Sequence, residues 1–442
     1  MTTLDRRILS LALPSIVSNI TVPLLGLCDV TIMGHVGGAR HIGAIAVGTM
    51  IFNVMYWLFG FLRMGTSGLT AQAYGAHRLD EAAVLLRRGL LMGMGIGMLF
   101  VLFQWPLRHL AFWLMQATPD VELLVTPYYY ICIWGVPAML GLYALTGWYI
   151  GMQNTRIPMF IAIGQNIVNI LASLLLVLVC GLGIKGVALG TLIAQWSGFL
   201  TALFLCRRYY GRMLRRVLGS WANQTTRLLK EAGVSDGHSA KAQRSVNLDI
   251  FLRTLCLVAV NLYFTSAGAA QGATILAANT LLMQFFTFFS YIMDGFAYAG
   301  EALAGRYYGA RDWSMLSQTV RRLFSWGGIM VAVFTLAYWL GGPAIVRLLT
   351  SDAEVVSTAH HYLPWTLLIP VTGMAAFVWD GIFIGITASR GMLHACFVAS
   401  VAFFLLYFLL FPALHNHALW IALLVYLALR GVVQTCIAVR AW

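Results

Sequence analysis

The chain has 442 residues and a net charge of +13, with 60% hydrophobic residues, 10% charged residues and a mean hydropathy of +0.81. Soluble domains carry about a quarter charged residues, so this composition excludes an ordinary soluble protein and indicates one embedded in lipid. Its apolar runs are continuous and lack the alternation of barrel strands, so they predict an all-α integral membrane protein.

Twelve apolar segments, each long enough to cross a bilayer, follow one another along the chain. The first covers 8–33, and the start of the chain lacks the cleavage site of a signal peptide. The others lie at 43–68, 83–105, 128–150, 158–180, 186–206, 248–268, 276–300, 320–341, 362–386, 393–412 and 417–437. We therefore expect an N-terminal six-helix lobe at 1–206, a cytoplasmic basic linker at 207–247 and a C-terminal six-helix lobe at 248–442.

The arginines predict the orientation of these segments. An even number of crossings places both termini on one side, and most arginines fall in the loops of that side. By the positive-inside rule this side is cytoplasmic, which predicts a multi-pass protein of the bacterial inner membrane. The charge excess is then a topology signal, so we expect membrane lipids and no nucleic acid as partners.

The two lobes carry an internal repeat. Tyr-Gly-Ala recurs at 74–76 and 308–310, and an arginine pair recurs at 87–88 and 321–322. "GMQNTR", which ends at Arg156, and "GITASR", which ends at Arg390, keep the same offset. The repeat predicts two pseudo-symmetric lobes around a central cavity, an arrangement that suits alternating access.

The first segment contains a carboxylate, Asp29, in "LLGLCDVTIMG". Ser15 and Ser18 fall on the same helical face, and Pro23 between them and Asp29 is expected to bend the helix. A lone carboxylate is a poor packing residue in a membrane, and no lysine or arginine lies deep in this lobe. We therefore expect Asp29 to be hydrated, protonated or bound to an ion.

Two further segments of this lobe carry polar faces. Asn166, Asn169 and Ser173 share one face of the fifth segment, and Thr191 and Gln195 are four residues apart in the sixth. An ion or substrate site would explain these polar residues, and hydrogen bonding between helices would explain them equally well.

The C-terminal lobe has a stripe of its own. Gln284, Tyr291 and Asp294 recur at helical spacing in the eighth segment, and Glu301 further along suits a solvated helix end. Asp380 is a third buried acid with no obvious partner, whereas the i, i+4 pair Asp249 and Arg253 predicts a local ion pair.

Candidates for a substrate cavity come from these polar faces and from flexible methionines, although ordinary packing is the commoner role of methionine. They are Met33, Asn166, Gln195, Met283, Gln284, Tyr291, Asp294 and Asp380.

Several chemistries lack their motifs. The seven cysteines sit in or beside apolar segments without metal-ligand spacing, and most histidines lie at segment ends. No phosphate-binding loop or hydrolase motif occurs. We expect no metal site, no cofactor and no enzymatic activity, and an ion gradient as the energy source.

Four stretches resemble the multidrug and toxic compound extrusion (MATE) family, and within it the branch named for the DNA-damage-inducible F protein. They are "ALPSIVSNITVPLLGLCDVTIMGH", "FLRMGTSGLTAQAYGA", "MDGFAYAGEALAGRYYGARD" and "NHALWIALLVYLALRG". The resemblance implies twelve helices in two lobes and cation-coupled export of small amphipathic, often cationic compounds, with a role in antibiotic resistance. We expect a monomer.

The resemblance also implies roles for particular residues. The family's coupling-ion carboxylate matches Asp29, its helix-bending proline matches Pro23, and the Asn and Thr of its sodium-type site match Asn169 and Thr191. Ser173 stands where that site has a second carboxylate. One carboxylate suffices for a proton, so we predict H⁺ as the coupling ion, with Na⁺ as the alternative.

Three other functions stay open at this point. A flippase for a lipid-linked precursor suits two-lobed bundles. We expect a flippase to need cationic groups in its cavity, whereas the polar residues deep in the membrane segments are acidic and neutral. An intramembrane transferase would need a convergent acid, base or nucleophile. A passive channel would conduct without coupling.

Overall fold

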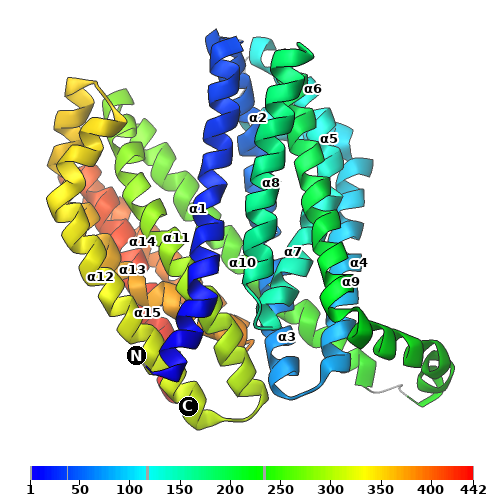
Figure 1. The fold of residues 1–442 in the computed structure, drawn as a ribbon. Helices are drawn as coiled ribbons and strands as arrows, with labels where there is room; N and C mark the ends of the chain where they lie inside the picture. Colours follow the sequence, from blue (N-terminus) through cyan, green and yellow to red (C-terminus); the bar gives the residue numbers. More distant parts are fainter. Residues whose placement is uncertain (1, 37, 116–118, 232–234, 442) are drawn as a thin grey trace. The chain divides into compact units, whose positions relative to one another are not determined.

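The computed structural model describes residues 2–36, 38–115, 119–231 and 235–441, with their side chains except at 22–31, 33–42, 114–121 and 216–242. Every regular element in these ranges is helical, which confirms the all-α class (Figure 1).

The first elements are α1 (Thr3–Val36), α2 (Gly38–Leu58), α3 (Phe61–Gly75), α4 (Leu79–Leu102), α5 (Gln104–Met115), α6 (Pro119–Cys132), a 3₁₀ turn (Ile133–Gly135), α7 (Val136–Gly151), α8 (Arg156–Leu174), a π-helical turn (Leu175–Val179) and α9 (Ile184–Glu231). The others are α10 (Ser235–Ala269), α11 (Ala273–Gly309), α12 (Trp313–Leu349), α13 (Ala353–Gly385), α14 (Ser389–Leu414) and α15 (Asn416–Ala441).

The long apolar helices match the predicted membrane segments. In the described part of the chain, 11 helical stretches are long and apolar enough to cross a bilayer, and each overlaps one predicted segment from 43–68 onward. The 34 residues of α1 cover the first predicted segment. α5 lies almost entirely outside the predicted segments. Those segments are chosen for a length that crosses a bilayer, and the 12 residues of α5 are too few.

The chain forms two compact units. Val17–Asn247 forms one, which we call the N-terminal lobe; Met1–Ile16 and Leu248–Trp442 form the other, which we call the C-terminal lobe. The first sixteen residues, predicted in the N-terminal lobe, therefore pack with the C-terminal lobe. The predicted linker at 207–247 is mostly helical, since α9 continues into it and α10 begins within it.

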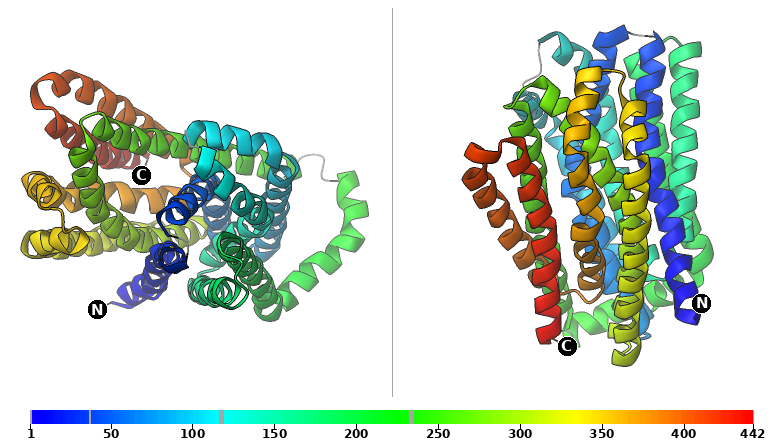
Figure 2. Two further views of the ribbon diagram at one scale, coloured as in Figure 1. Left: turned by 90° about the horizontal axis from the view of Figure 1, so that it is seen from above. Right: turned by 90° about the vertical axis from the view of Figure 1, so that its left-hand side faces the viewer.

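The C-terminal lobe is built of packed antiparallel helices. α11 packs against α12 and α13, and α15 packs against α13 and α14. Figure 2 shows α14 and α15, coloured orange to red, running side by side. The two chain ends lie at the same end of this lobe (Figure 1), as an even number of crossings requires. Which side of the membrane they face stays a prediction.

The start of α1 is fixed to this lobe by polar contacts. Thr2 and Asp5 form a reciprocal cap: the Asp5 carboxylate accepts the Thr2 N–H at 2.8 Å, and the Thr2 hydroxyl accepts the Asp5 N–H at 3.2 Å. The Trp326 indole donates to the other Asp5 oxygen at 3.3 Å, and Arg7 donates to the Tyr307 hydroxyl at 3.3 Å. These contacts join α1 to α11 and α12.

The internal repeat extends to backbone conformation. Four non-glycine residues with positive φ end helices in pairs at one offset of 234 residues: His77 (59°) with Arg311 (57°), and Gln153 (63°) with Thr387 (57°). Each is followed by an amide that closes the same 6→1 hydrogen bond, at 2.8 to 2.9 Å, to the end of its helix. The two lobes therefore share turn geometry as well as sequence.

Helix crossings follow the same offset. A Cβ on Gly147 of α7 would lie 2.2 Å from the carbonyl oxygen of Arg63 in α3. A Cβ on Gly381 of α13 would lie 2.2 Å from the carbonyl oxygen of Ala297 in α11. Only glycine permits backbones to approach this closely, which is typical of membrane helix pairs.

Candidate functional site

A buried polar cluster lies between α8 and α9 of the N-terminal lobe. The Asn169 amide donates to the Thr191 hydroxyl at 3.0 Å, and Asn169 and Ser173 are each 0% exposed, one turn apart on α8. A Cβ on Gly190 would lie 2.2 Å from the Ser173 oxygen, so the backbone of α9 passes directly beside this hydroxyl. The structure thus brings together Asn169, Ser173 and Thr191, which we call the N-lobe cluster.

The N-lobe cluster contains two oxygens without hydrogen-bond partners. The Asn169 side-chain oxygen and the Ser173 hydroxyl oxygen are buried without a hydrogen-bond partner. A buried polar atom without a partner costs about 1–3 kcal/mol. Two residues after Ser173 the helix widens into the π-helical turn Leu175–Val179, a feature frequent at functional sites. Unsatisfied oxygens beside a widened helix suit a cation or a proton donor as ligand.

Two other predicted residues of this lobe contact different helices. The Asn166 amide donates to the backbone carbonyl of Thr21 at 3.0 Å, which joins α8 to α1 about two helical turns before Asp29. The Gln195 amide donates to the Tyr56 hydroxyl of α2 at 3.1 Å. Asp29, Pro23 and Met33 belong to α1, but their side chains lie outside the described residues.

The predicted stripe on α11 lies on one helix of the C-terminal lobe. Met283, Tyr291 and Asp294 are half-buried and Gln284 is exposed. Tyr291 and Asp294, three residues apart, are close enough to interact electrostatically. Asp380, the remaining cavity candidate, belongs to a separate group of side chains.

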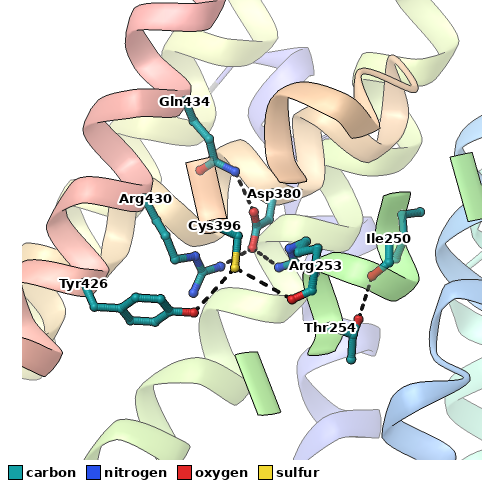
Figure 3. A network of polar contacts seen from close by, with 8 residues as sticks. All are labelled: Ile250, Arg253, Thr254, Asp380, Cys396, Tyr426, Arg430 and Gln434. Atoms are coloured by element: carbon teal, nitrogen blue, oxygen red, sulfur yellow. Dashed lines mark hydrogen bonds and ion pairs between the residues drawn. The ribbon is translucent and has the colours of Figure 1, made fainter. Parts of the chain in front are cut away.

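Asp380 has two cationic partners, so the expectation that it lacks a partner is wrong. Arg253 of α10 and Arg430 of α15 both donate to its Oδ2 atom, and Gln434 of α15 donates to Oδ1 at 2.7 Å (Figure 3). The side chains of both arginines are 6% exposed or less. We call Arg253, Asp380, Arg430 and Gln434 the C-lobe cluster.

The predicted ion pair of Asp249 with Arg253 is also wrong. Arg253 faces Asp380, and Asp249 instead accepts a hydrogen bond from the Ser389 hydroxyl at 2.7 Å. An i, i+4 pair gains only about 0.2–0.5 kcal/mol on a helix, far less than a buried carboxylate gains from two guanidinium groups. The expectation that the polar residues deep in the membrane segments are all acidic or neutral is also wrong, because the C-lobe cluster contains two buried arginines.

Sequence reasoning missed Arg253, Arg430 and Gln434 as site residues. A signal was present, because Arg430 lies inside the predicted segment 417–437 with Gln434 one turn later. An arginine at that depth requires a partner, and Asp380 was the buried acid without one.

The described residues hold no group of three or more His, Cys, Asp or Glu side chains able to bind a metal. A histidine pair lies between α13 and α15, where the Nε2 atoms of His361 and His417 are 3.2 Å apart. The Trp365 indole donates to His417 Nδ1 at 3.0 Å, so neutral His417 carries its proton on Nε2 and donates it to His361. This tautomer leaves His417 Nε2 without a free lone pair for a metal.

These features define a class: a multi-pass helical membrane protein of two repeated lobes with buried polar clusters, the architecture of secondary transporters. The model of the MatE family matches residues 14–175 and 250–409, one stretch from each half of the chain.

Individual relatives agree with this match. The chain is 38% identical over 448 residues to DNA damage-inducible protein F of Escherichia coli, covering 100% of this chain and 94% of the relative. It is 23% identical to a probable multidrug resistance protein NorM of Acinetobacter baylyi, covering 81% and 78%. The crystal structure of the Vibrio cholerae MATE transporter VcmN in the bent form matches with a TM-score of 0.85 at 17% identity, covering 99% and 97%.

The chain therefore belongs to the multidrug and toxic compound extrusion family, as its sequence motifs indicate. Members of this family are transporters, so this protein is a membrane transporter and not an enzyme, which removes the intramembrane transferase from the alternatives.

Proposed function

We propose that the protein is a secondary active multidrug efflux transporter of the bacterial inner membrane. It exports small amphipathic, often cationic compounds in exchange for protons, by alternating access. Family membership supports efflux, and the relative from Escherichia coli supports a bacterial inner-membrane location.

One observation supports the proton in particular. The side chains of the N-lobe cluster are all neutral, and the second carboxylate expected of a sodium-type site is Ser173. A dehydrated sodium ion needs several oxygens and enough negative charge to offset its lost hydration. Among the coupling-ion candidates Asp29, Asn169, Ser173 and Thr191, Asp29 is the one carboxylate, so a single proton balances the charge of the site.

In the proposed cycle, Asp29 takes a proton from the periplasmic side and α1 bends near Pro23. Bending shifts the part of α1 held by Asn166, and the hydrogen bonds of the N-lobe cluster rearrange. The bound compound is expelled, and the transporter returns to the inward-open state and releases the proton to the cytoplasm. The cycle runs because proton and compound prefer different states.

Two other functions remain as alternatives. Sodium coupling requires the neutral oxygens of the N-lobe cluster and Asp29 to hold Na⁺ together. A lipid-linked precursor flippase gains one supporting observation from the buried Arg253 and Arg430, because phosphates need cationic partners. Both arginines, however, already share Asp380.

The test is efflux of ethidium from proteoliposomes under an imposed pH gradient, with and without sodium. We expect efflux to follow the pH gradient in the wild type and to be lost in Asp29→Asn, because the amide cannot exchange a proton. Asp80→Asn, an exposed carboxylate at the start of α4, is the matched control and should transport normally.

Each outcome distinguishes the alternatives. Coupled efflux by Asp29→Asn contradicts the mechanism, and efflux driven by sodium but not by pH replaces the proton with sodium. Restoring the second carboxylate with Ser173→Asp should introduce sodium dependence. Translocation of a fluorescent phospholipid with no ethidium efflux would favour the flippase, and ethidium flux that never accumulates against a gradient would indicate a channel.

A further inference from the structure

The C-lobe cluster has an excess of positive charge. Arg253 and Arg430 are both paired with one carboxylate, Asp380, and the arginine side chains are 6% and 5% exposed. Two guanidinium groups and one carboxylate leave one positive charge uncompensated. An unbalanced charge at this burial, inside helices that span a membrane, is unfavourable unless a counter-charge is close.

The cluster also has unused hydrogen-bond donors. Both arginines donate to the same oxygen of Asp380, whose other oxygen is taken by Gln434 (Figure 3). Neither arginine contacts Oδ1, so each guanidinium meets the carboxylate through a single oxygen. The Nε atoms of Arg253 and Arg430 are buried and have no hydrogen-bond partner. Cationic donors without acceptors suit an anion as ligand.

Among the described residues, the acidic groups around Arg430 do not supply that anion. Besides Asp380, the acidic groups that act on Arg430 are the Tyr426 phenol and the Cys396 thiol. The Cys396 sulfur lies 3.7 Å from the backbone carbonyl oxygen of Arg253, an acceptor that requires the protonated thiol as donor. Tyr426 presents its ring to Arg430, 5.5 Å from the guanidinium carbon, which partly offsets the charge without balancing it.

We propose that the C-lobe cluster is a binding site for one small monovalent anion of the halide class, held by Arg253 and Arg430. Both arginine side chains are 6% exposed or less, so a small free anion suits the site better than a bulky head group. The site lies within a single lobe and does not depend on which cation drives transport.

A charge series tests the proposal on the purified full-length protein. Arg430→Gln leaves Asp380 and Arg253 as a neutral pair, so the cluster stays balanced and folded. Asp380→Asn leaves both arginines without a carboxylate and raises the charge by one. Arg440→Gln removes the same charge from the exposed end of α15 and is the matched control.

The first measurement is the Tm in sodium chloride, sodium bromide and sodium gluconate at equal ionic strength and pH. The halides should raise the Tm of the wild type by a few degrees in a saturable way, because a ligand that binds only the folded state stabilises it. The shift should be larger in Asp380→Asn, absent in Arg430→Gln and unchanged in Arg440→Gln. A wild-type Tm independent of the anion, or a halide shift that survives in Arg430→Gln, overturns the site.

Two further measurements fix the identity of the anion. Crystals grown in bromide should show anomalous scattering between the two guanidinium groups, and its absence counts against the proposal. Cys396→Ala should leave the halide shift as it is. If this variant instead gains a halide shift that the wild type lacks, the thiolate is the counter-charge and the proposal is wrong.

Discussion

The two lobes share a backbone plan, but only the C-lobe cluster contains buried cationic donors, on Arg253 and Arg430. In the N-lobe cluster the atoms without partners are oxygens, on Asn169 and Ser173. In the C-lobe cluster they are the Nε donors of Arg253 and Arg430 and the side-chain oxygen of Gln434. A site rich in acceptors attracts a cation or a proton, whereas a site rich in cationic donors attracts an anion.

The repeat offset locates where the lobes diverge. Asn169 and Ser173 on α8 correspond at 234 residues to Phe403 and Tyr407 on α14, both buried. Asp380 on α13 corresponds to Thr146 on α7. Duplication thus preserved the turns and the close helix crossings, while the polar groups differ, because side chains vary without disturbing a glycine contact between backbones.

The largest effect should come from removing the carboxylate of the C-lobe cluster. In sodium gluconate, Asp380→Asn should lose about 3–5 kcal/mol of stability, because it leaves two buried guanidinium groups unpaired. Thermal unfolding in detergent, followed by circular dichroism, measures this loss. Asp249→Asn in the same lobe replaces the charged acceptor of Ser389 with an amide oxygen and should lose about 1 kcal/mol or less. Equal losses would mean that the cluster is not the charged centre described here.

The shared crossings should respond alike in the two lobes. Gly147→Ala and Gly381→Ala each force a Cβ to within 2.2 Å of a carbonyl oxygen, so each should lose about 1–3 kcal/mol or more. The readout is the Tm of each variant.

Glycines in open space provide the controls for these crossings. Gly95→Ala on α4 and Gly328→Ala on α12 meet nothing within 4 Å, so they should be neutral or slightly stabilising. A large loss in only one of the two crossings would show that the lobes differ in packing as well as in polarity.

Within the N-lobe cluster, removing a hydrogen-bonded oxygen and removing an unbonded one should differ in their effect on stability. Thr191→Val removes the acceptor of the Asn169 amide and should lose about 1–2 kcal/mol. Ser173→Ala removes an oxygen that has no partner, so stability should stay within about 1 kcal/mol of the wild type or rise. Chemical or thermal unfolding separates the two variants. A larger loss from Ser173→Ala would reveal a partner of this hydroxyl.

The smallest effect concerns Asp5, which fixes the start of α1 to the C-terminal lobe. Hydrogen bonds from the Thr2 N–H and hydroxyl lower the pKa of the Asp5 carboxyl from its ordinary value of 3.8. The charged form is favoured in the folded state, so its contribution is complete above about pH 4 and is lost as pH falls through the lowered pKa. The Tm advantage over Asp5→Asn should be constant from pH 7 to 5 and shrink below pH 4. An advantage that persists at pH 2 would contradict this assignment.

The sequence by itself determined the membrane class, the spans and the repeat. Apolar length sets where a helix crosses a bilayer, and the repeated Tyr-Gly-Ala motif marks turns whose geometry is local. Helical periodicity likewise placed Asn169 and Ser173 on one face, and the structure brings both beside α9. Such features depend on neighbours within a turn or two of helix, so they can be predicted from the sequence without knowledge of the tertiary structure.

Only the tertiary structure decided which charges meet. Local spacing paired Arg253 with Asp249, but packing of α10, α13 and α15 places it on Asp380 instead. Tertiary packing also decided where the first sixteen residues belong: contacts with Tyr307 and Trp326, far along the chain, hold them to the C-terminal lobe. A buried charge is paired by whichever opposite charge the fold brings within reach, because desolvation outweighs the small gain of a neighbour on the same helix.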